Sequence, residues 1–286
     1  CKVFSTACPG QPRWRALMCE KADQAVGYGA DGVLYDQIGG MPAYPCFDPA
    51  HHHENPSRSY TAGRMQLLED LRTRAHTGGI ALLSEHITDL YAQYLDAIHG
   101  MESYPDAQGT EILSQTQPIS SGFPALFRYC FPECIVTVRN GAPRISPRLV
   151  GYAFVHGFRF EMEARYFADR TYLEEKRTPE WTEYAFRVAA LRRTYADLLL
   201  NGQYLGDQGI VHDTPQLTVV RYQNDTRQGV ALLNDSTENV PVALSIPGYH
   251  VTEYATVDGT GAGMLDSLSP GAVALLLIAP DLDIKE

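Results

Sequence analysis

The sequence has no apolar run of about 18 residues or more, the length that a transmembrane helix needs. Its beginning also lacks the charged and apolar regions of a secretory signal peptide. Basic residues are in the minority, since 23 Lys and Arg stand against 34 Asp and Glu, a formal charge of −11. This balance argues against nucleic acid or an anionic membrane as a partner.

Several motifs of known chemistry are missing as well. There is no Gly-rich phosphate loop and no Gly-x-Ser-x-Gly elbow. The six cysteines all lie in the first half of the chain, and none belongs to a Cys-x2-Cys pair typical of a zinc site. We interpret them as free thiols that behave as small apolar residues, which favours a cytoplasmic compartment. The sequence therefore predicts no metal and no cofactor.

What is present is the composition of a soluble globular protein: 286 residues, 44% hydrophobic and 20% charged. This length accommodates one large domain or two ordinary ones. The chain begins at Cys1 without an initiator Met, and its first residues have the pattern of a strand already in progress. We expect it to be a portion of a longer protein. The sequence indicates no oligomeric state.

The first two-thirds of the chain alternates strand-like and helix-like patterns. Strand patterns occur at residues 3–8, 33–35, 80–83, 124–131 and 149–160, and helical patterns at residues 12–26, 63–76, 87–98 and 179–200. Repeated strand–helix units are typical of a parallel sheet or a barrel. Five strands are found where a complete barrel needs eight, so the sequence predicts the C-terminal portion of a (β/α)8 TIM-type barrel whose first strands precede Cys1.

The pattern changes after residue 208. Short strands are predicted at residues 217–222, 229–234, 240–246, 251–255 and 272–278, with turns rather than helices between them. This is typical of a small antiparallel β-sandwich. We therefore predict two domains, a barrel portion at residues 1–208 and a sandwich at residues 209–286.

Two acidic residues lie where predicted strands end. Asp36 follows a short buried strand and precedes a glycine-rich loop, and Glu85 ends the next strand. The carboxyl ends of parallel strands meet at one edge, where α/β enzymes carry out their chemistry. Two facing carboxyl groups are what glycoside hydrolysis requires. Taken singly, either acid could instead cap the segment that follows it.

Other polar residues are candidates for binding a sugar. The loop after Asp36 carries Asp48, His51 and His53, donors and acceptors that suit a sugar subsite. Adjacent histidines in a loop rarely point to one ion, and no second ligand cluster is evident, so sugar binding is favoured over metal. A solvated loop is the alternative. Arg128 and His156 interrupt apolar strand patterns and must be paired or face a cleft, a demand that the barrel's interior could also meet.

A resemblance to a known family rests on these segments. The motifs are Cys8-Pro9, Trp14, residues 30–39 with Tyr35-Asp36-Gln37, Cys46-Phe47-Asp48, Ser84-Glu85, Phe127-Arg128-Tyr129 and Phe131-Pro132-Glu133. They resemble a bacterial family of glycoside hydrolase-like barrels of poorly known function, related to the endo-α-N-acetylgalactosaminidases and more distantly to α-galactosidases. The resemblance covers most of residues 1–165.

The resemblance implies a retaining enzyme with Asp36 as nucleophile and Glu85 as acid/base. Gln37, next to Asp36, is a further candidate for binding the substrate. The resulting hypothesis is a glycosidase that cleaves an O-glycosidic, α-linked bond of an oligosaccharide or glycoconjugate. One alternative is a non-catalytic barrel remnant with a β-sandwich, which binds carbohydrate without cleaving it. Another is an α-galactosidase-type hydrolase whose acid is an Asp, for which Asp89 is the nearest candidate.

Overall fold

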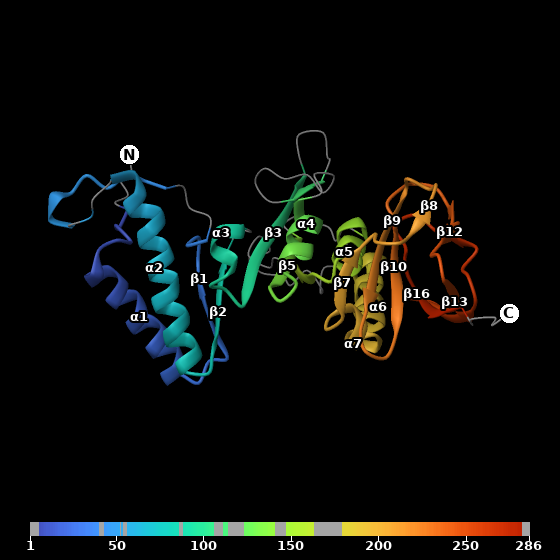
Figure 1. Cartoon of the computed structure of the whole chain (residues 1–286), viewed down its shortest axis with the longest axis horizontal. Coiled ribbons are helices and arrows are strands. Elements are labelled where there is room, and N and C mark those ends of the chain that lie inside the picture. The colour runs from blue at the N-terminus through green and yellow to red at the C-terminus, as the bar shows by residue number, and fades with distance from the viewer. Residues whose placement is uncertain are drawn as a thin grey trace. The chain divides into compact units, whose positions relative to one another are not determined.

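In the computed structural model, the described residues are 6–39, 43–51, 53, 56–85, 88–105, 111–113, 123–140, 147–162 and 179–281. They divide into two compact units. The first is Cys1–Met101 with Glu133–Val136, and the second is Glu102–Pro132 with Thr137–Glu286. Figure 1 shows the elements in chain order.

The first unit is an α/β layer. Its elements are α1 (Pro12–Gly27), β1 (Gly32–Tyr35), the 3-10 helix η1 (Pro49–His51), α2 (Pro56–Thr77), β2 (Ala81–Glu85), α3 (Asp89–Ala92) and the start of β3 (Ala97–Pro105). β2 pairs in parallel with β1 on one side and β3 on the other. The Ile135 backbone amide donates to the Asp96 carbonyl at 3.2 Å, so β5 (Ile135–Asn140) starts beside the start of β3.

α1 begins where the sequence predicts it. The Gln11 side chain accepts a hydrogen bond from the Arg13 amide at 3.3 Å, and Pro12 occupies the first turn, where its missing N–H costs nothing. α1 packs along α2, as Figure 1 shows. The Tyr35 hydroxyl at the end of β1 donates to the Met18 carbonyl at 2.7 Å. This bond fixes the end of β1 to the middle of α1.

The second unit begins with mixed helices and strands. These are the end of β3, β4 (Glu111–Leu113), α4 (Phe123–Cys130), most of β5, α5 (Pro147–Val155), β6 (Arg159–Met162), α6 (Pro179–Thr194) and α7 (Ala196–Leu199). β5 and β6 pair in parallel. α5 is buried from Leu149 to Val155 and packs on β9 (Leu217–Gln223), β10 (Gln228–Asn234) and β16 (Val273–Pro280). Gly151 allows this approach, because a Cβ there would lie 2.4 Å from Leu233 Cδ1.

The rest of the second unit is antiparallel. Its other strands are β7 (Gln203–Gly206), β8 (Val211–His212), β11 (Val240–Pro241), β12 (Leu244–Ser245), β13 (Tyr249–Thr256), β14 (Gly259–Ala262) and β15 (Ser267–Leu268). Six strands form one sheet in the order β14-β13-β16-β10-β9-β7, and the pairs β11-β15 and β12-β8 form two small sheets. One apolar core joins these sheets, with Val230, Leu232 and Leu276 fully buried.

The structure corrects three predictions in the α/β part. The strand predicted at residues 124–131 is instead helical up to Cys130 in α4, and Phe127 stacks on Phe131 just after the helix at 4.9 Å. Residues 149–160 form the end of α5 and the start of β6, because a helix buried on all sides has the same unbroken apolar run as a buried strand. Residues 87–98 are not one helix, since α3 ends at Ala92 and β3 begins at Ala97.

Other predicted elements agree with the structure, have different bounds, are divided, or in one case are not formed by the described residues. The helix at residues 63–76 starts earlier, at Pro56, and the helix at residues 179–200 is divided between α6 and α7. Residues 6–8 are not a strand, and the rest of the strand predicted at residues 3–8 lies outside the described residues. The strand predicted at residues 240–246 is broken into β11 and β12.

The described residues form a partial α/β fold with parallel strands, followed by antiparallel sheets, and a closed barrel is not confirmed. The boundary at residue 208 stays a prediction, although the antiparallel sheet already takes its first strand, β7, from Gln203 onward.

Candidate active site

Asp36 and Glu85 lie at the carboxyl ends of two adjacent parallel strands. The last residue pair between β1 and β2 is Tyr35 and Ser84. Asp36 directly follows Tyr35, and Glu85 directly follows Ser84. The Asp36 side chain is exposed, whereas that of Glu85 is 17% exposed. The strand ends predicted for both acids are therefore present, side by side in one sheet.

The turn that carries Asp36 is tied to β2 by a buried hydroxyl. Ser84 is 0% exposed, and its Oγ donates to the Tyr35 carbonyl at 2.8 Å and accepts from the Gly39 amide at 3.0 Å. Gln37 has a φ of 59°, which places it in the left-handed region that few non-glycine residues adopt. Such conformations persist where the surroundings enforce them, often at functional sites.

Glu85 has a partner that sequence reasoning missed. His99 on β3 is opposite Glu85 in the parallel register, and its Nε2 lies 3.8 Å from Glu85 Oε1. His99 was overlooked because residues 87–98 were read as a helix. The signal that could have found it is the short apolar segment Ala97-Ile98 after Asp96, which is also typical of a strand. Asp89, the alternative acid, is exposed at the first position of α3.

In the loop after β1, the predicted binding residues Asp48, His51 and His53 have contacts within the first unit, and their role in sugar binding stays a prediction. Asp48 Oδ1 accepts from the Ala50 amide at 2.9 Å, and Asp48 Oδ2 lies 3.3 Å from His51 Nε2. His51 and His53 lie close to two cysteines. One ring nitrogen of each histidine and the Cys8 and Cys46 sulfurs all lie within 4.8 Å of one another. The sequence indicated no metal ligands besides the histidines. The structure adds two thiols, Cys8 and Cys46, which are far apart in the sequence.

The two cysteines of this group are both free thiols. Burial raises the pKa of the Cys8 thiol, and the neighbouring Cys46 adds to this increase, while the Gly10 and Gln11 backbones act in the opposite direction. The donor set is two sulfurs and two imidazole nitrogens, which is suited to a soft or borderline divalent metal. His52, the middle residue of the triple histidine, lies outside the described residues.

Arg128 and His156 are buried within the second unit. His156 Nδ1 lies 2.9 Å from the Tyr204 hydroxyl, and the Arg128 guanidinium is 5.6 Å from the centre of the Tyr204 ring. Burial, with a smaller contribution from the Arg128 charge, lowers the pKa of His156 to about 3, so its imidazole is neutral. Both side chains have partners inside the unit. Of the two possibilities given by the sequence, pairing or facing a cleft, the structure shows pairing. Their role in substrate binding stays a prediction.

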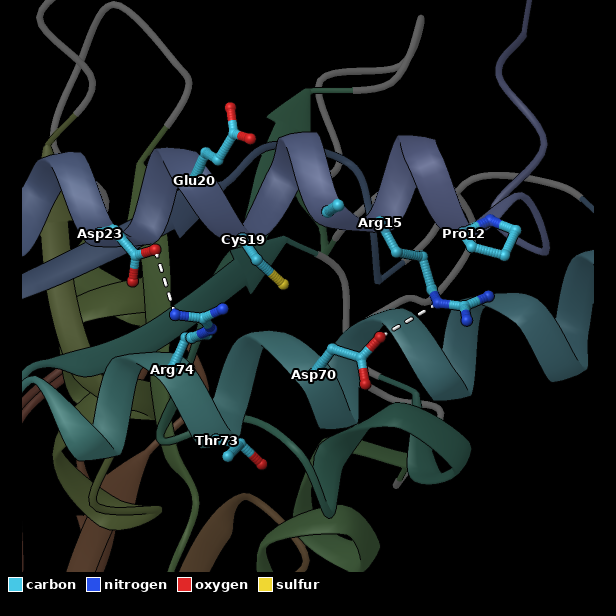
Figure 2. A pocket seen from close by; sticks show the side chains of 9 residues that line it. Pro12, Arg15, Cys19, Glu20, Asp23, Asp70, Thr73 and Arg74 are labelled. Carbon is cyan, nitrogen blue, oxygen red and sulfur yellow. Dashed lines mark hydrogen bonds and ion pairs between the residues drawn. The ribbon is translucent and has the colours of Figure 1, made fainter.

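A pocket of about 420 Å³ lies between α1 and α2 in the first unit (Figure 2). Arg15 and Asp70 form an ion pair of 3.0 Å across it, and Arg74 and Asp23 form another of 3.3 Å. The buried Cys19 lies on the same lining. None of the predicted site residues lines this pocket, so it is a groove between two helices rather than an extension of the candidate site.

Comparison with known proteins finds one family model that matches part of the chain. A family model described as "Domain of unknown function (DUF6259)" matches residues 2–137, which include Asp36, Glu85 and His99. No protein among the curated sequences matches.

Solved structures with a similar fold include α-amylase-type enzymes. An Anoxybacillus α-amylase has 12% sequence identity and a TM-score of 0.54, covering 96% of this chain and 64% of its own. A Nostoc punctiforme debranching enzyme soaked with acarbose has 11% identity and a TM-score of 0.59, covering 94% and 61%. An isomaltulose synthase from Klebsiella has 10% identity and a TM-score of 0.60, covering 94% and 69%.

At this level of identity the likeness shows the fold alone. The chain spans less than two-thirds of the length of the Anoxybacillus and Nostoc enzymes. The relation to the endo-α-N-acetylgalactosaminidases in particular is not shown. In the described part of the chain, every helix is too short or too polar to cross a membrane.

Proposed function

We propose that this chain is part of a glycoside hydrolase that cleaves an α-linked O-glycosidic bond with retention of configuration. The observation that carries the proposal is the presence of Asp36 and Glu85 at the carboxyl ends of adjacent, in-register parallel strands. The α-amylase-type fold of the structural neighbours supports it. The substrate is a carbohydrate, the class to which acarbose in the Nostoc structure belongs.

In the proposed mechanism, the Asp36 carboxylate attacks the anomeric carbon and forms a glycosyl ester. Protonated Glu85 gives its proton to the departing glycosidic oxygen as that bond breaks. Glu85 then removes a proton from water, the water oxygen attacks the anomeric carbon, and the Asp36 carboxylate is released. His99 contacts Glu85 and is suited to orient its carboxyl group. Gln37 and Asp48 remain candidates for contacts with the sugar.

The test uses the complete protein and a panel of aryl α- and β-glycosides. The panel includes α-glucosides, α-galactosides and α-N-acetylgalactosaminides, because the structural neighbours favour the first and the family resemblance the other two. Asp36→Asn and Glu85→Gln are each expected to lower kcat/KM on the cleaved glycoside by about 10²–10⁴-fold or more while leaving the fold intact. Asp31→Asn and Glu69→Gln, both exposed in the same unit, are matched controls with near-normal rates.

Near-normal turnover by Asp36→Asn would remove the nucleophile assignment. Azide is expected to restore turnover of an activated glycoside to Glu85→Ala, as it does when an acid/base side chain is missing. The pH–rate profiles of Glu85→Gln and Asp89→Asn separate Glu85 from the alternative acid, because only the true acid/base variant loses the basic limb. Carbohydrate binding without turnover, unchanged in Asp36→Asn, would favour the non-catalytic alternative.

A further inference from the structure

We propose that Cys8, Cys46, His51 and His53 bind one zinc ion in a closed tetrahedral site that holds the loop after β1 against the start of α1. The four candidate ligand atoms all lie within 4.8 Å of one another. Tetrahedral zinc with sulfur and nitrogen ligands at about 2.3 and 2.0–2.1 Å implies ligand–ligand separations of roughly 3.3–3.8 Å. One of these separations, from Cys46 Sγ to His51 Nδ1, is already 3.2 Å. Small movements of the other ligands complete the geometry.

The surroundings of the two histidines support this assignment. His51 directs Nδ1 toward the Cys46 sulfur, while its Nε2 lies 3.3 Å from Asp48 Oδ2. A carboxylate on the outer nitrogen of an imidazole is the arrangement that fixes the tautomer and orientation of a zinc-bound histidine. The Ala50 amide in turn holds Asp48 at 2.9 Å. In the proposed site, Asp48 thus orients a ligand and does not bind the metal.

His53 provides an independent observation. Its Nε2 is one of three side-chain polar atoms among the described residues that are fully buried without a hydrogen-bond partner. A buried nitrogen without a partner costs free energy, and metal coordination removes that cost. Its ring is in edge contact with the His51 ring, at 6.1 Å between centroids. An ideal Cβ at Gly10 would lie 3.6 Å from His53 Cδ2 and 3.5 Å from Cys8 Sγ, so both ligands lie beside this one backbone position.

The donor set selects zinc. Two thiolates and two imidazoles at tetrahedral positions are the ligands of structural zinc, and hard cations such as Mg²⁺ and Ca²⁺ prefer oxygen. Four protein ligands leave no open position for substrate or water, so the ion is structural and takes no part in the proposed hydrolysis. In this assignment His51 and His53 are not sugar ligands. The inference does not rest on the proposed function.

The site explains how a long connection is held. Residues 36–55 link β1 to α2, and the only regular element between them in the described part is the one-turn helix η1. Cys8 is buried in a turn that Arg15 fixes by donating to the Gly10 carbonyl at 3.1 Å. Zinc ties the loop, through Cys46, His51 and His53, to this rigid turn. The loop that begins with Asp36 then has a defined shape.

The experiment measures metal content and ligand geometry in the complete protein. The protein is purified with zinc present and then desalted. It is expected to contain about one zinc ion per chain, measured by inductively coupled plasma mass spectrometry. Cys8→Ser and His53→Ala are each expected to reduce this content at least about fivefold. Cys130→Ser and His250→Ala, which replace exposed residues outside the group, are matched controls that keep the full content.

Cobalt substitution tests the donor set without any variant. Co²⁺ added to the metal-free protein is expected to give the intense visible bands of a tetrahedral site and the thiolate charge-transfer band of two sulfurs. The cobalt spectrum tests whether the four residues bind one metal ion even if Cys8→Ser does not fold. Absence of zinc together with a Cys8–Cys46 disulfide, detected by mapping under non-reducing conditions, would overturn the proposal. So would metal that survives in both ligand variants, or the weak spectrum of octahedral cobalt.

Discussion

Ser84 is a small polar residue that is completely buried between β1 and the turn carrying Asp36. Its one hydroxyl donates to the Tyr35 carbonyl and accepts from the Gly39 amide, so each backbone group has a partner away from water. These two bonds close the turn in which Gln37 adopts its left-handed conformation. The position of Asp36 therefore depends on a residue 48 positions further along the chain, since 84 minus 36 is 48.

We expect Ser84→Ala to destabilise the protein by about 1–3 kcal/mol, because it removes the acceptor of the Gly39 amide and one bond to the Tyr35 carbonyl in a buried place. The measurement is urea unfolding followed by circular dichroism. Thr77→Ala is the matched control, since that exposed hydroxyl bonds a carbonyl of its own helix, and its effect is expected within about 0.5 kcal/mol. Equal effects of the two variants would contradict the role assigned to Ser84.

At the scale of elements, α2 lies directly against the turn that precedes α1. A Cβ at Gly63 would be 2.4 Å from the Gly10 nitrogen and 2.7 Å from the Pro9 carbonyl carbon. These neighbours are backbone atoms, which cannot rotate away as a side chain can. Contact between the two segments thus requires glycine at position 63, although glycine is unfavourable inside a helix.

Gly63→Ala is expected to destabilise the protein by about 1–3 kcal/mol, because the added methyl group forces the turn away from α2. Gly27→Ala is the control. Its Cβ would meet nothing within 4 Å at the end of α1, so the change is expected to be neutral or to stabilise by up to about 1 kcal/mol. The measurement is the midpoint of thermal unfolding of each variant, compared with that of the parent protein. A Gly63→Ala variant as stable as the parent would exclude the close approach.

At the scale of the whole molecule, acidic charge and a buried histidine have opposite effects on stability as the pH falls. The formal charge of −11 decreases in magnitude when carboxylates become protonated, which relieves repulsion. His156 acts the other way. Its pKa in the folded state is about 3 against an ordinary value of 6.5, so the unfolded chain takes up the proton first.

Between about pH 6.5 and 3, this difference makes the His156 contribution fall by up to about 1.4 kcal/mol for each pH unit. His156→Gln keeps a group able to bond the Tyr204 hydroxyl but does not titrate in this range. Relative to the parent, we expect it to lose less stability on acidification from pH 7 to pH 4.5. Urea unfolding at several pH values measures the two slopes, and parallel slopes would show that His156 is protonated in the folded state.

The sequence by itself determined the elements whose signals are local. The helix from Pro12 follows from its first-turn proline and apolar spacing, and the strands that end next to Asp36 and at Glu85 follow from short apolar segments between turns. The antiparallel strands near Leu217, Gly229 and Val273 were found for the same reason. Such signals lie within a few residues of the element they define, so no distant contact is needed to read them.

Only the tertiary structure decided the rest, because burial and partners depend on distant segments. α5 was read as a strand, since a helix enclosed by β9, β10 and β16 needs no polar face. His99 joined Glu85 only through the pairing of β3 with β2. Cys8 and Cys46 met the two histidines only when the loop folded back on the start of α1. Spacing along the chain carries no trace of such contacts, because the fold alone sets the distance between residues far apart in sequence.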